Sequence, residues 1–455
     1  MLNKNIDFAL VGHNFFSYLM GIGLTVRNHK VLILDDDRFN HGDLFTDSLT
    51  ILDLEILKKW GEKYDVPPLK KMEEYIQFSP ISFYVGKKEV ILGDNPSRNY
   101  TELARKFPHF FSISNMTENF DQGLFQVAYS LAESFYSDQN LIKLSKRLET
   151  FKHLEIMKKF EEFYALFFQK DKWDMMLQSE LNSFVSLSRG FFHNRLSING
   201  SRSELMHLFF SLLSPHFHFN HDRLVTDLLE HFRSIGGEFK KLNLKDFKFH
   251  RGVLSSFEFE SFEGLISPGQ LIFIGGEPIG MPILLKEKVM AYNTMEVKLK
   301  LSSPVPPSLE GKKILFSSPI KTGTNWPFWQ ACFHQDSIVF NLVMQKGQGL
   351  KEEFVSNKVI NFLMEDLTYL YPEYQFNVVD SNLKFTLDVL VEDNNLYAHR
   401  EDAPKVNWKP LTVYSKISPF SFFKLKNVTY LGPYRGNTHG IFSSLIQLQK
   451  RMESI

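Results

Sequence analysis

Near the start of the chain, three residues have the spacing of a phosphate-binding turn. In the dinucleotide-binding pattern G-x-G-x-x-G, the first glycine makes a tight turn and the second lets a pyrophosphate approach the backbone. The third lets the helix pack closely on the strand. Here these positions are Gly12, Asn14 and Ser17, so one glycine of the pattern is present. Asp35 follows about 20 residues later, where such sites place the acid that binds ribose hydroxyls. This spacing predicts a dinucleotide site.

The elements around this turn predict a βαβ unit. Residues 6–11 form a short apolar run typical of a buried strand, and apolar residues recur at helical spacing from Phe15 to Val26. A second apolar run, 30–34, ends at the acidic residues Asp35 and Asp36. The amino end of a helix that follows the turn directly would face a bound phosphate. The same segment is also typical of a βαβ unit without a ligand, and that alternative stays open.

The rest of the chain predicts further strands and helices in alternation. Helices are expected at 49–60, 221–232 and 353–370, with a mainly helical region at 101–189. Strands are expected at 81–92 (a pair), 238–244, 253–260, 271–276, 297–301, 313–316, 337–343 and 428–431. The pattern favours an α/β protein: a Rossmann-like dinucleotide-binding domain joined to a second, α+β domain.

Composition limits the classes of protein to consider. A chain of 455 residues favours two domains. Lys plus Arg number 52 and so do Asp plus Glu, which argues against a nucleic-acid partner because binding phosphates needs a basic excess. No run of about 18 apolar residues predicts a membrane span. We therefore expect a cytoplasmic protein. Contact with a membrane surface through the charged, amphipathic helices around 141–168 stays an alternative.

Other groups of residues could carry chemistry, and each has a plainer interpretation. They are His216, His218 and His221 as metal ligands, Asp35–Asp37 as a magnesium site, Lys298 and Lys300 near a cofactor, Trp326, Phe328 and Trp329 around a pocket, and Cys332 as a thiol. No carboxylate or cysteine is spaced to complete the histidine set, and a single cysteine excludes a disulfide framework. We predict no metal site and assign no catalytic residue.

Several segments, in order along the chain, resemble one known superfamily. They are the Gly12 to Asp35 spacing, Arg38–Gly42, Phe83–Val90, Leu224–Gly237, Phe273–Gly276, Leu370–Glu373, Tyr430–Gly432 and Thr438–Ile441. Together they resemble the FAD-dependent amine oxidase and phytoene desaturase superfamily, whose fold group includes the Rab GDP-dissociation inhibitors. The resemblance covers nearly the whole chain.

The resemblance implies interleaved domains, a flavin and a reaction. The nucleotide-binding domain would comprise residues 1–75, 201–290 and 416–455, and the substrate domain residues 76–200 and 291–415. FAD would lie against Gly12, Asn14, Ser17, Asp35, Asp36, Gly42, Gly275, Gly432, Gly440 and Ile441. The implied function is an FAD-dependent oxidoreductase that acts on a small apolar or amine substrate.

The departures from the family pattern support a second hypothesis. Besides Asn14 and Ser17, the family's double glycine after the acid is His41–Gly42, and its late Gly-Asp is Gly432–Pro433. These residues lie where a flavin would make contact, and an unpaired buried polar group costs about 1–3 kcal/mol. The alternative is a flavin-free, non-catalytic binding protein with a protein partner, as in the GDP-dissociation inhibitors.

Overall fold

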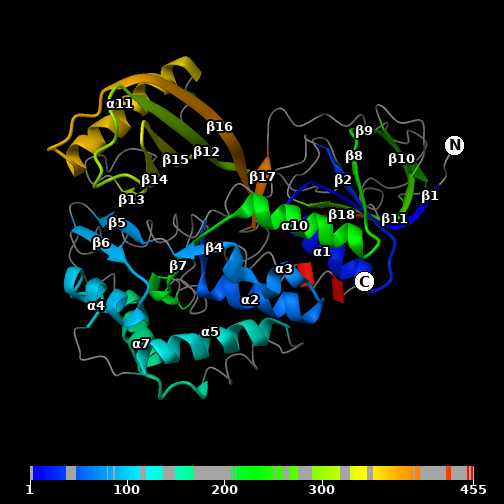
Figure 1. Cartoon of the computed structure of the whole chain (residues 1–455), viewed down its shortest axis with the longest axis horizontal. Helices are drawn as coiled ribbons and strands as arrows, with labels where there is room; N and C mark the ends of the chain where they lie inside the picture. Colours follow the sequence, from blue (N-terminus) through cyan, green and yellow to red (C-terminus); the bar gives the residue numbers. More distant parts are fainter. Residues whose placement is uncertain are drawn as a thin grey trace.

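The computed structural model gives a mixed α/β protein with two large sheets. It describes residues 4–36, 48–78, 80–85, 88–112, 119–136, 149–168, 206, 209–210, 212–250, 253–259, 266–274, 289–317, 328–345, 352–392, 395–399, 427–431, 448–449 and 452–453. A largely parallel sheet lies at one end of the molecule and a largely antiparallel sheet at the other, with several helices running beside and between them (Figure 1).

The parallel sheet contains the predicted βαβ unit. Strand β1 lies between β2 and β11, and β2 pairs in turn with β8. The start of β11 pairs antiparallel with β10, and its end pairs parallel with β18. The strands are β1 (Lys4–Val11), β2 (Val31–Asp35), β8 (Glu238–Lys241), β9 (Leu244–His250), β10 (Val253–Phe259), β11 (Ile266–Ile274) and β18 (Val428–Leu431). Since β1, β2, β11 and β18 run parallel, their carboxyl ends lie at one edge.

Alternation along these strands separates two apolar layers. Leu10 and Ile33 belong to the core shared with helix α1 (Phe15–Val26), whereas Ala9 and Leu34 belong to the core shared with β9 and β10. Because successive side chains in a strand point to opposite faces, the two faces of this sheet are covered differently. Within the predicted strand 6–11, residues 8–11 are buried on both faces of the sheet, as expected for a parallel sheet, whereas Asp7 is exposed.

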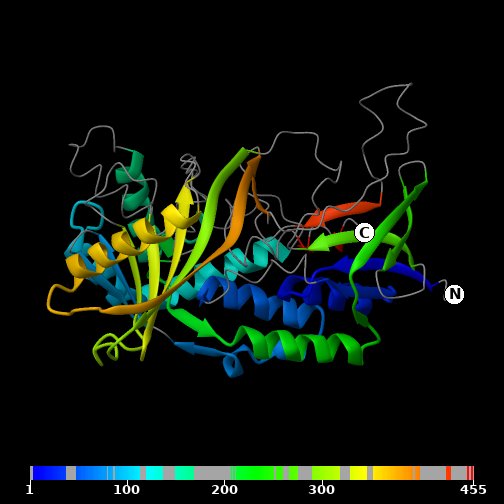
Figure 2. The same cartoon turned by 90° about the horizontal axis from the view of Figure 1, so that it is seen from above.

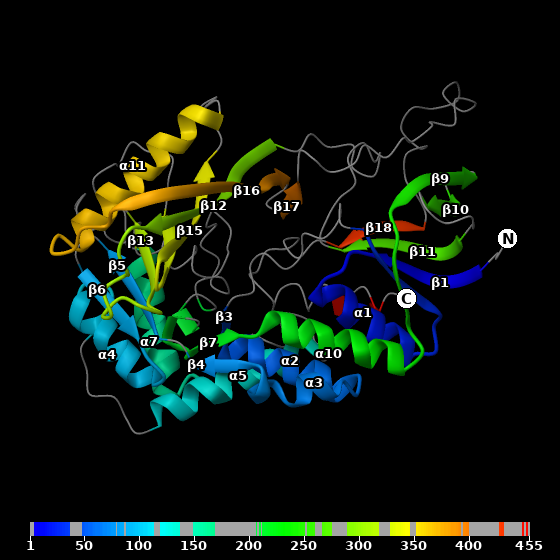
Figure 3. The same ribbon diagram turned by 45° about the horizontal axis from the view of Figure 1, so that its top comes forward.

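Helices α1 and α10 (His221–Ser234) pack against each other beside the parallel sheet. Next to them lie α2 (Ile51–Lys63), α3 (Pro67–Lys70) and the short 3₁₀ turn η2 (Met72–Glu74). A small sheet of β3 (Ser48–Thr50), β7 (His216–Phe219) and β4 (Ile76–Phe78) lies at the start of α10 (Figure 3). The predicted helix at 49–60 starts later, at Ile51, because Thr50 and Asp53 form a capping box there.

The large sheet has the order β17-β16-β12-β15-β14-β13-β5-β6. Its strands are β5 (Ile81–Val85), β6 (Lys88–Leu92), β12 (Val289–Leu301), β13 (Lys313–Ser317), β14 (Phe328–His334), β15 (Ser337–Gln345), β16 (Val378–Glu392) and β17 (Asn395–His399). Its pairings are antiparallel except for β5 with β13. Helix α11 (Glu352–Leu370) packs on one face of this sheet (Figure 2). There, the Trp329 indole N–H donates to Asp366 Oδ2 at 2.8 Å.

The chain has 45 phenylalanines, and many of those that the structure describes are buried in the cores. Helices α4 (Pro96–Lys106), α5 (Phe120–Tyr136) and α7 (Glu155–Phe168) surround a group of buried rings. The rings are those of Tyr100, Phe107, Phe110, Phe111, Phe120, Phe160, Phe163, Phe209 and Phe210. One apolar cluster continues from these rings to α1 and β1, so the helices connect the two sheets.

The predicted fold class is therefore confirmed, with differences in detail. Strands of the parallel sheet come from residues 4–35, 238–274 and 428–431, and those of the large sheet from 81–92 and 289–399, while the exact domain boundaries stay predictions. Strand β12 starts eight residues before the predicted 297, and no strand was predicted for β16, which pairs with it along its length. No described helix is both long and apolar enough to cross a membrane.

Candidate functional site

The turn between β1 and α1 is built around Gly12. Its φ of +131° is one that residues with a side chain rarely adopt, and a Cβ on it would lie 2.4 Å from the Ile274 carbonyl oxygen. Its N–H donates to the Leu34 carbonyl at 2.9 Å. Gly12 thus allows the chain to turn sharply after β1, beside the end of β11, which is the role predicted for the first glycine of the pattern.

Asn14 takes the second glycine position and caps α1 with its side chain. Its backbone is extended, with φ −152° and ψ 167°, so the left-handed conformation open to asparagine is not used. Its Oδ1 accepts the Ser17 N–H at 2.9 Å and the Ser17 hydroxyl at 3.0 Å. Its Nδ2 donates to the Ile274 carbonyl at 2.8 Å. Asn14 and Ser17 are fully buried, so this carboxamide is an internal link between α1 and β11.

His13, between Gly12 and Asn14, turns toward the aromatic side chains beside it. Its Nδ1 is hydrogen-bonded to the Tyr18 hydroxyl, and its ring meets Phe239 edge-on at 5.5 Å between centroids. Phe239 lies on β8, and Tyr18 is buried on α1. The imidazole of His13 therefore packs against its own chain.

The two acids at the end of β2 are also used within the chain. Asp35, the last residue of β2, is 5% exposed, and its backbone carbonyl accepts the Leu242 N–H at 3.0 Å. Asp36 is fully buried, and its Oδ2 accepts the Leu244 N–H at 2.8 Å. The Asp36 carboxylate is therefore not exposed to solvent, and it fixes the entry of the chain into β9. Asp37 lies outside the described residues.

The other predicted cofactor residues, Gly42, Gly275, Gly432, Gly440 and Ile441, lie outside the described residues. The strands that lead to two of them are described. Ile274 ends β11 and Leu431 ends β18, and these two residues are paired in parallel register. The structure thus brings together the turn at Gly12, the acid Asp35 and the strand ends before 275 and 432, at the edge where open α/β sheets bind ligands.

This turn does not fit a pyrophosphate. Gly12 and Asp35 have the positions that a dinucleotide site requires, but the second position of the pattern must leave the backbone bare. Here the Asn14 carboxamide fills the first turn of α1 and accepts the Ser17 N–H. A phosphate would reach these groups only after that side chain had left, and its departure would leave the Ile274 carbonyl without this donor.

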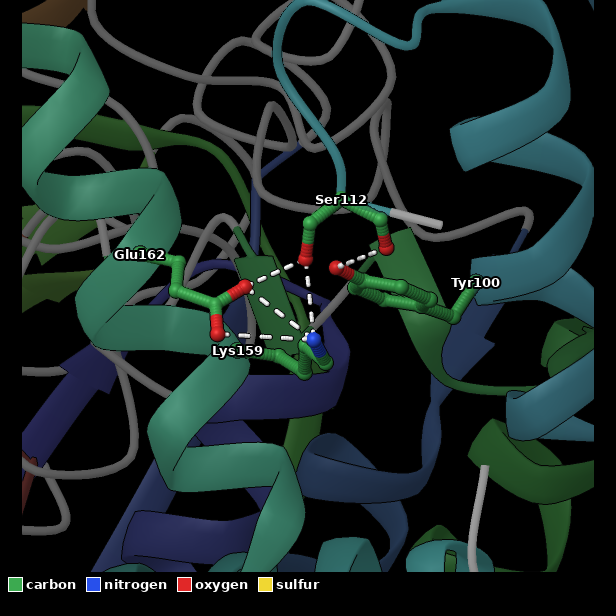
Figure 4. Close-up of polar contacts among 4 residues, drawn as sticks. All are labelled: Tyr100, Ser112, Lys159 and Glu162. Atoms are coloured by element: carbon green, nitrogen blue, oxygen red, sulfur yellow. Dashed lines mark hydrogen bonds and ion pairs between the residues drawn. The ribbon is translucent and has the colours of Figure 1, made fainter. Parts of the chain in front are cut away.

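A second polar cluster joins α7 to the segment after α4 (Figure 4). The Lys159 ammonium, whose side chain is 8% exposed, donates to Ser112 Oγ at 2.8 Å and pairs with Glu162 at 3.1 Å. Ser112 Oγ is also hydrogen-bonded to Glu162, and the Tyr100 hydroxyl donates to the Ser112 carbonyl at 3.3 Å. Burial raises the pKa of Tyr100 to about 12, so this hydroxyl stays protonated at neutral pH. Lys159 and Glu162, both on α7, are hydrogen-bonded to Ser112 Oγ, so the cluster holds the segment after α4 against α7.

The remaining candidates from the sequence lie elsewhere. Lys298 and Lys300 are exposed on β12, and Trp329 is buried under α11. Cys332 is half-buried on β14. His216 is buried and His218 exposed on β7, and among the described residues no group of three or more His, Cys, Asp or Glu is arranged to hold a metal. Trp326 lies outside the described residues.

Sequence reasoning missed the partners of these residues. The Ile274 carbonyl contacts Asn14 across 260 positions, and the Leu244 N–H contacts Asp36 across 208. A local signal for Asn14 did exist, because asparagine directly before an apolar helical run is a preferred N-cap. The Lys159 cluster had no signal beyond the alternation of charged and apolar residues on α7.

No protein-family model matches the sequence, and no curated protein matches it.

Solved structures are similar to the chain at low sequence identity. An oxidoreductase from Methanosarcina mazei is 10% identical over 98% of this chain and all of that one, with a TM-score of 0.49. PqsL from Pseudomonas aeruginosa, a probable FAD-dependent monooxygenase, is 9% identical over 99% of this chain and 86% of that one, with a TM-score of 0.44. The flavin-dependent brominase Bmp2 is 8% identical over 98% and 76%, with a TM-score of 0.42. At these values, no activity is transferred from those proteins to this chain.

Proposed function

We propose that this chain is a non-catalytic binding protein that works without a flavin on a two-domain Rossmann-type scaffold. The observation that carries the proposal is the buried Asn14 carboxamide, which lies where a dinucleotide would bind. It accepts a hydrogen bond from the Ser17 N–H of α1 and donates one to the Ile274 carbonyl of β11. The proposal is also supported by the Asp36 carboxylate, which accepts a hydrogen bond from the first residue of β9. The superfamily that the sequence resembles includes GDP-dissociation inhibitors, which bind a partner protein, and a protein partner is accordingly the expected ligand.

Flavin uptake tests this proposal. The purified chain is incubated with excess FAD and desalted, and its absorbance is recorded at the flavin bands, with a desalted FAD solution as the blank. We expect a colourless protein that takes up no FAD. A yellow protein, or one that binds FAD stoichiometrically, would exclude the flavin-free function. Asn14→Gly, which clears the turn, is measured in parallel: uptake by this variant alone would place the obstacle at Asn14.

The second candidate is an FAD-dependent oxidoreductase of the amine oxidase or phytoene desaturase type, acting on an apolar or amine substrate. The specific observation in its favour is Gly12, which makes a tight turn with a φ of +131°, the role of the first glycine in a dinucleotide turn. Asp35 at the end of β2 is also in place. Stoichiometric flavin in the wild-type protein would support this function over the first.

A further inference from the structure

We infer that the Asn14 carboxamide replaces a bound diphosphate as the link between α1 and β11, and that the turn requires a group that both accepts and donates. The inference rests on the proposed flavin-free function and adds to it the chemistry that the turn demands. An anion only accepts hydrogen bonds, whereas the carboxamide of asparagine provides one acceptor and two N–H donors.

The need for a hydrogen-bond acceptor in the turn comes from helix α1. The first N–H groups of a helix have no partner inside the helix, and they attract a negative or partly negative group. Asn14 Oδ1 accepts one of them, the N–H of Ser17, at 2.9 Å. A phosphate oxygen could meet this requirement equally well, so the cap alone does not distinguish an amide from an anion.

The need for a hydrogen-bond donor comes from strand β11, and this need does distinguish an amide from an anion. The Ile274 carbonyl oxygen points into the turn, 2.4 Å from the place where a Cβ on Gly12 would lie. Asn14 Nδ2 donates to this oxygen at 2.8 Å in a buried position. A diphosphate would instead set a negative oxygen against the carbonyl, and a buried carbonyl that loses its donor is destabilising. The pair of groups that face each other across the turn therefore suits a carboxamide.

Another asparagine in this chain provides the matched control. Asn220 caps α10 in the same way, with Oδ1 accepting the Arg223 N–H at 3.1 Å, but it is exposed. In an exposed cap, asparagine and aspartate are about equally good, and the charge of aspartate favours the amino end of the helix. Asn14 and Asn220 thus share the acceptor role and differ in the buried link to a strand carbonyl.

The test compares Asn14→Asp with Asn220→Asp by thermal and urea unfolding at pH 7. Aspartate keeps the oxygen that caps the helix and removes the donor. We expect Asn14→Asp to lower the Tm by several degrees and Asn220→Asp to leave it unchanged or slightly raised. The loss in Asn14→Asp should shrink as the pH falls toward 4, because a protonated carboxyl can again donate to Ile274. A merely steric effect would not depend on pH in this way.

Two results would overturn the inference. One is an Asn14→Asp protein as stable as the wild type at pH 7. The other is a loss that is the same at every pH. If Asn14→Asp does not fold, Asn14→Ser decides the question, since serine keeps a cap oxygen but cannot supply the amide N–H to Ile274. Wild-type stability in Asn14→Ser would count against the link, and lowered stability would support it. FAD uptake by the wild type would overturn the proposed function separately, without any of these variants.

Discussion

The two ends of helix α1 differ in the residues that stand where another group comes close to the helix. Glycines stand there in its second half, and an asparagine stands there at its start. In its second half, Gly21 and Gly23 leave room for other parts of the chain: a Cβ would lie 2.9 Å from Ile33 at the first and 2.3 Å from Met452 at the second. At its start, where the dinucleotide pattern would leave room for a phosphate, Asn14 fills the space. Gly21 and Gly23 therefore leave space for side chains of the protein itself, whereas the Asn14 side chain occupies the space that a bound phosphate would need.

Gly12 belongs to the same turn as Asn14, and its close contact is also with the chain itself. It meets the first requirement of the dinucleotide pattern, yet the group that crowds it is the Ile274 carbonyl of the chain itself. The close packing of the turn against β11 is therefore enough to explain why a glycine is needed here. The presence of a glycine at this position is consistent with a Rossmann-type domain and does not by itself indicate a nucleotide.

The largest effect is expected from Gly12→Ala. The positive φ costs about 1–2 kcal/mol with a side chain, and the clash with the Ile274 carbonyl adds about 1–3 kcal/mol. Urea unfolding measures the sum. Gly311→Ala is the control, because Gly311 also has a positive φ, +73°, but no atom lies within 4 Å of its Cβ position. Equal losses in the two variants would mean that the approach of β11 contributes nothing.

Gly21→Ala should have the next largest effect. Its Cβ would lie 2.9 Å from Ile33 and 3.0 Å from Phe232, both buried, so overpacking should cost about 1–3 kcal/mol and exceed the gain of about 1 kcal/mol in helix propensity. Gly123→Ala in α5 is the control, since its nearest atom is 3.4 Å away. That variant should be stabilised. A stabilised Gly21→Ala would mean that Ile33 and Phe232 do not need the space that Gly21 leaves.

Periodicity and turn residues predicted much of this half of the molecule. The strand 6–11, the turn at Gly12 and the strand ending at Asp35 follow from local patterns, and they are present. The bonds of Asn14 to Ile274 and of Asp36 to Leu244 could not be predicted. Both partners are distant in sequence, and both are backbone groups, which every residue type has. A cap and a ligand site share the same local signal, and only the partner tells them apart.

Gly23→Ala should have a smaller effect than Gly21→Ala, although its Cβ would come closer to another atom. The atom in question is Cε of Met452, the far end of a flexible side chain that can move. The gain in helix propensity of about 1 kcal/mol should nearly offset the repacking cost, so the free energy of unfolding should change by less than about 1 kcal/mol. Thermal unfolding checks this. A loss as large as in Gly21→Ala would show that the contact with Met452 is rigid.

The smallest effect concerns pH and the helix that packs on α1. His231 lies on α10, and burial lowers its pKa below the ordinary 6.5, more strongly than the Asp65 carboxylate raises it. The unfolded chain therefore binds the proton more readily, so stability should fall as the pH drops below about 6.5. Replacing His231 with glutamine should flatten this slope in urea unfolding between pH 7 and 5. An unchanged slope would assign the pH dependence to other groups.

The most direct test of the central claim is a crystal structure of the wild-type protein grown in excess FAD. We expect the Asn14 carboxamide still to lie between the Ser17 N–H and the Ile274 carbonyl, with no diphosphate at the start of α1. A diphosphate bound at the start of α1, with Asn14 turned away from Ile274, would contradict it.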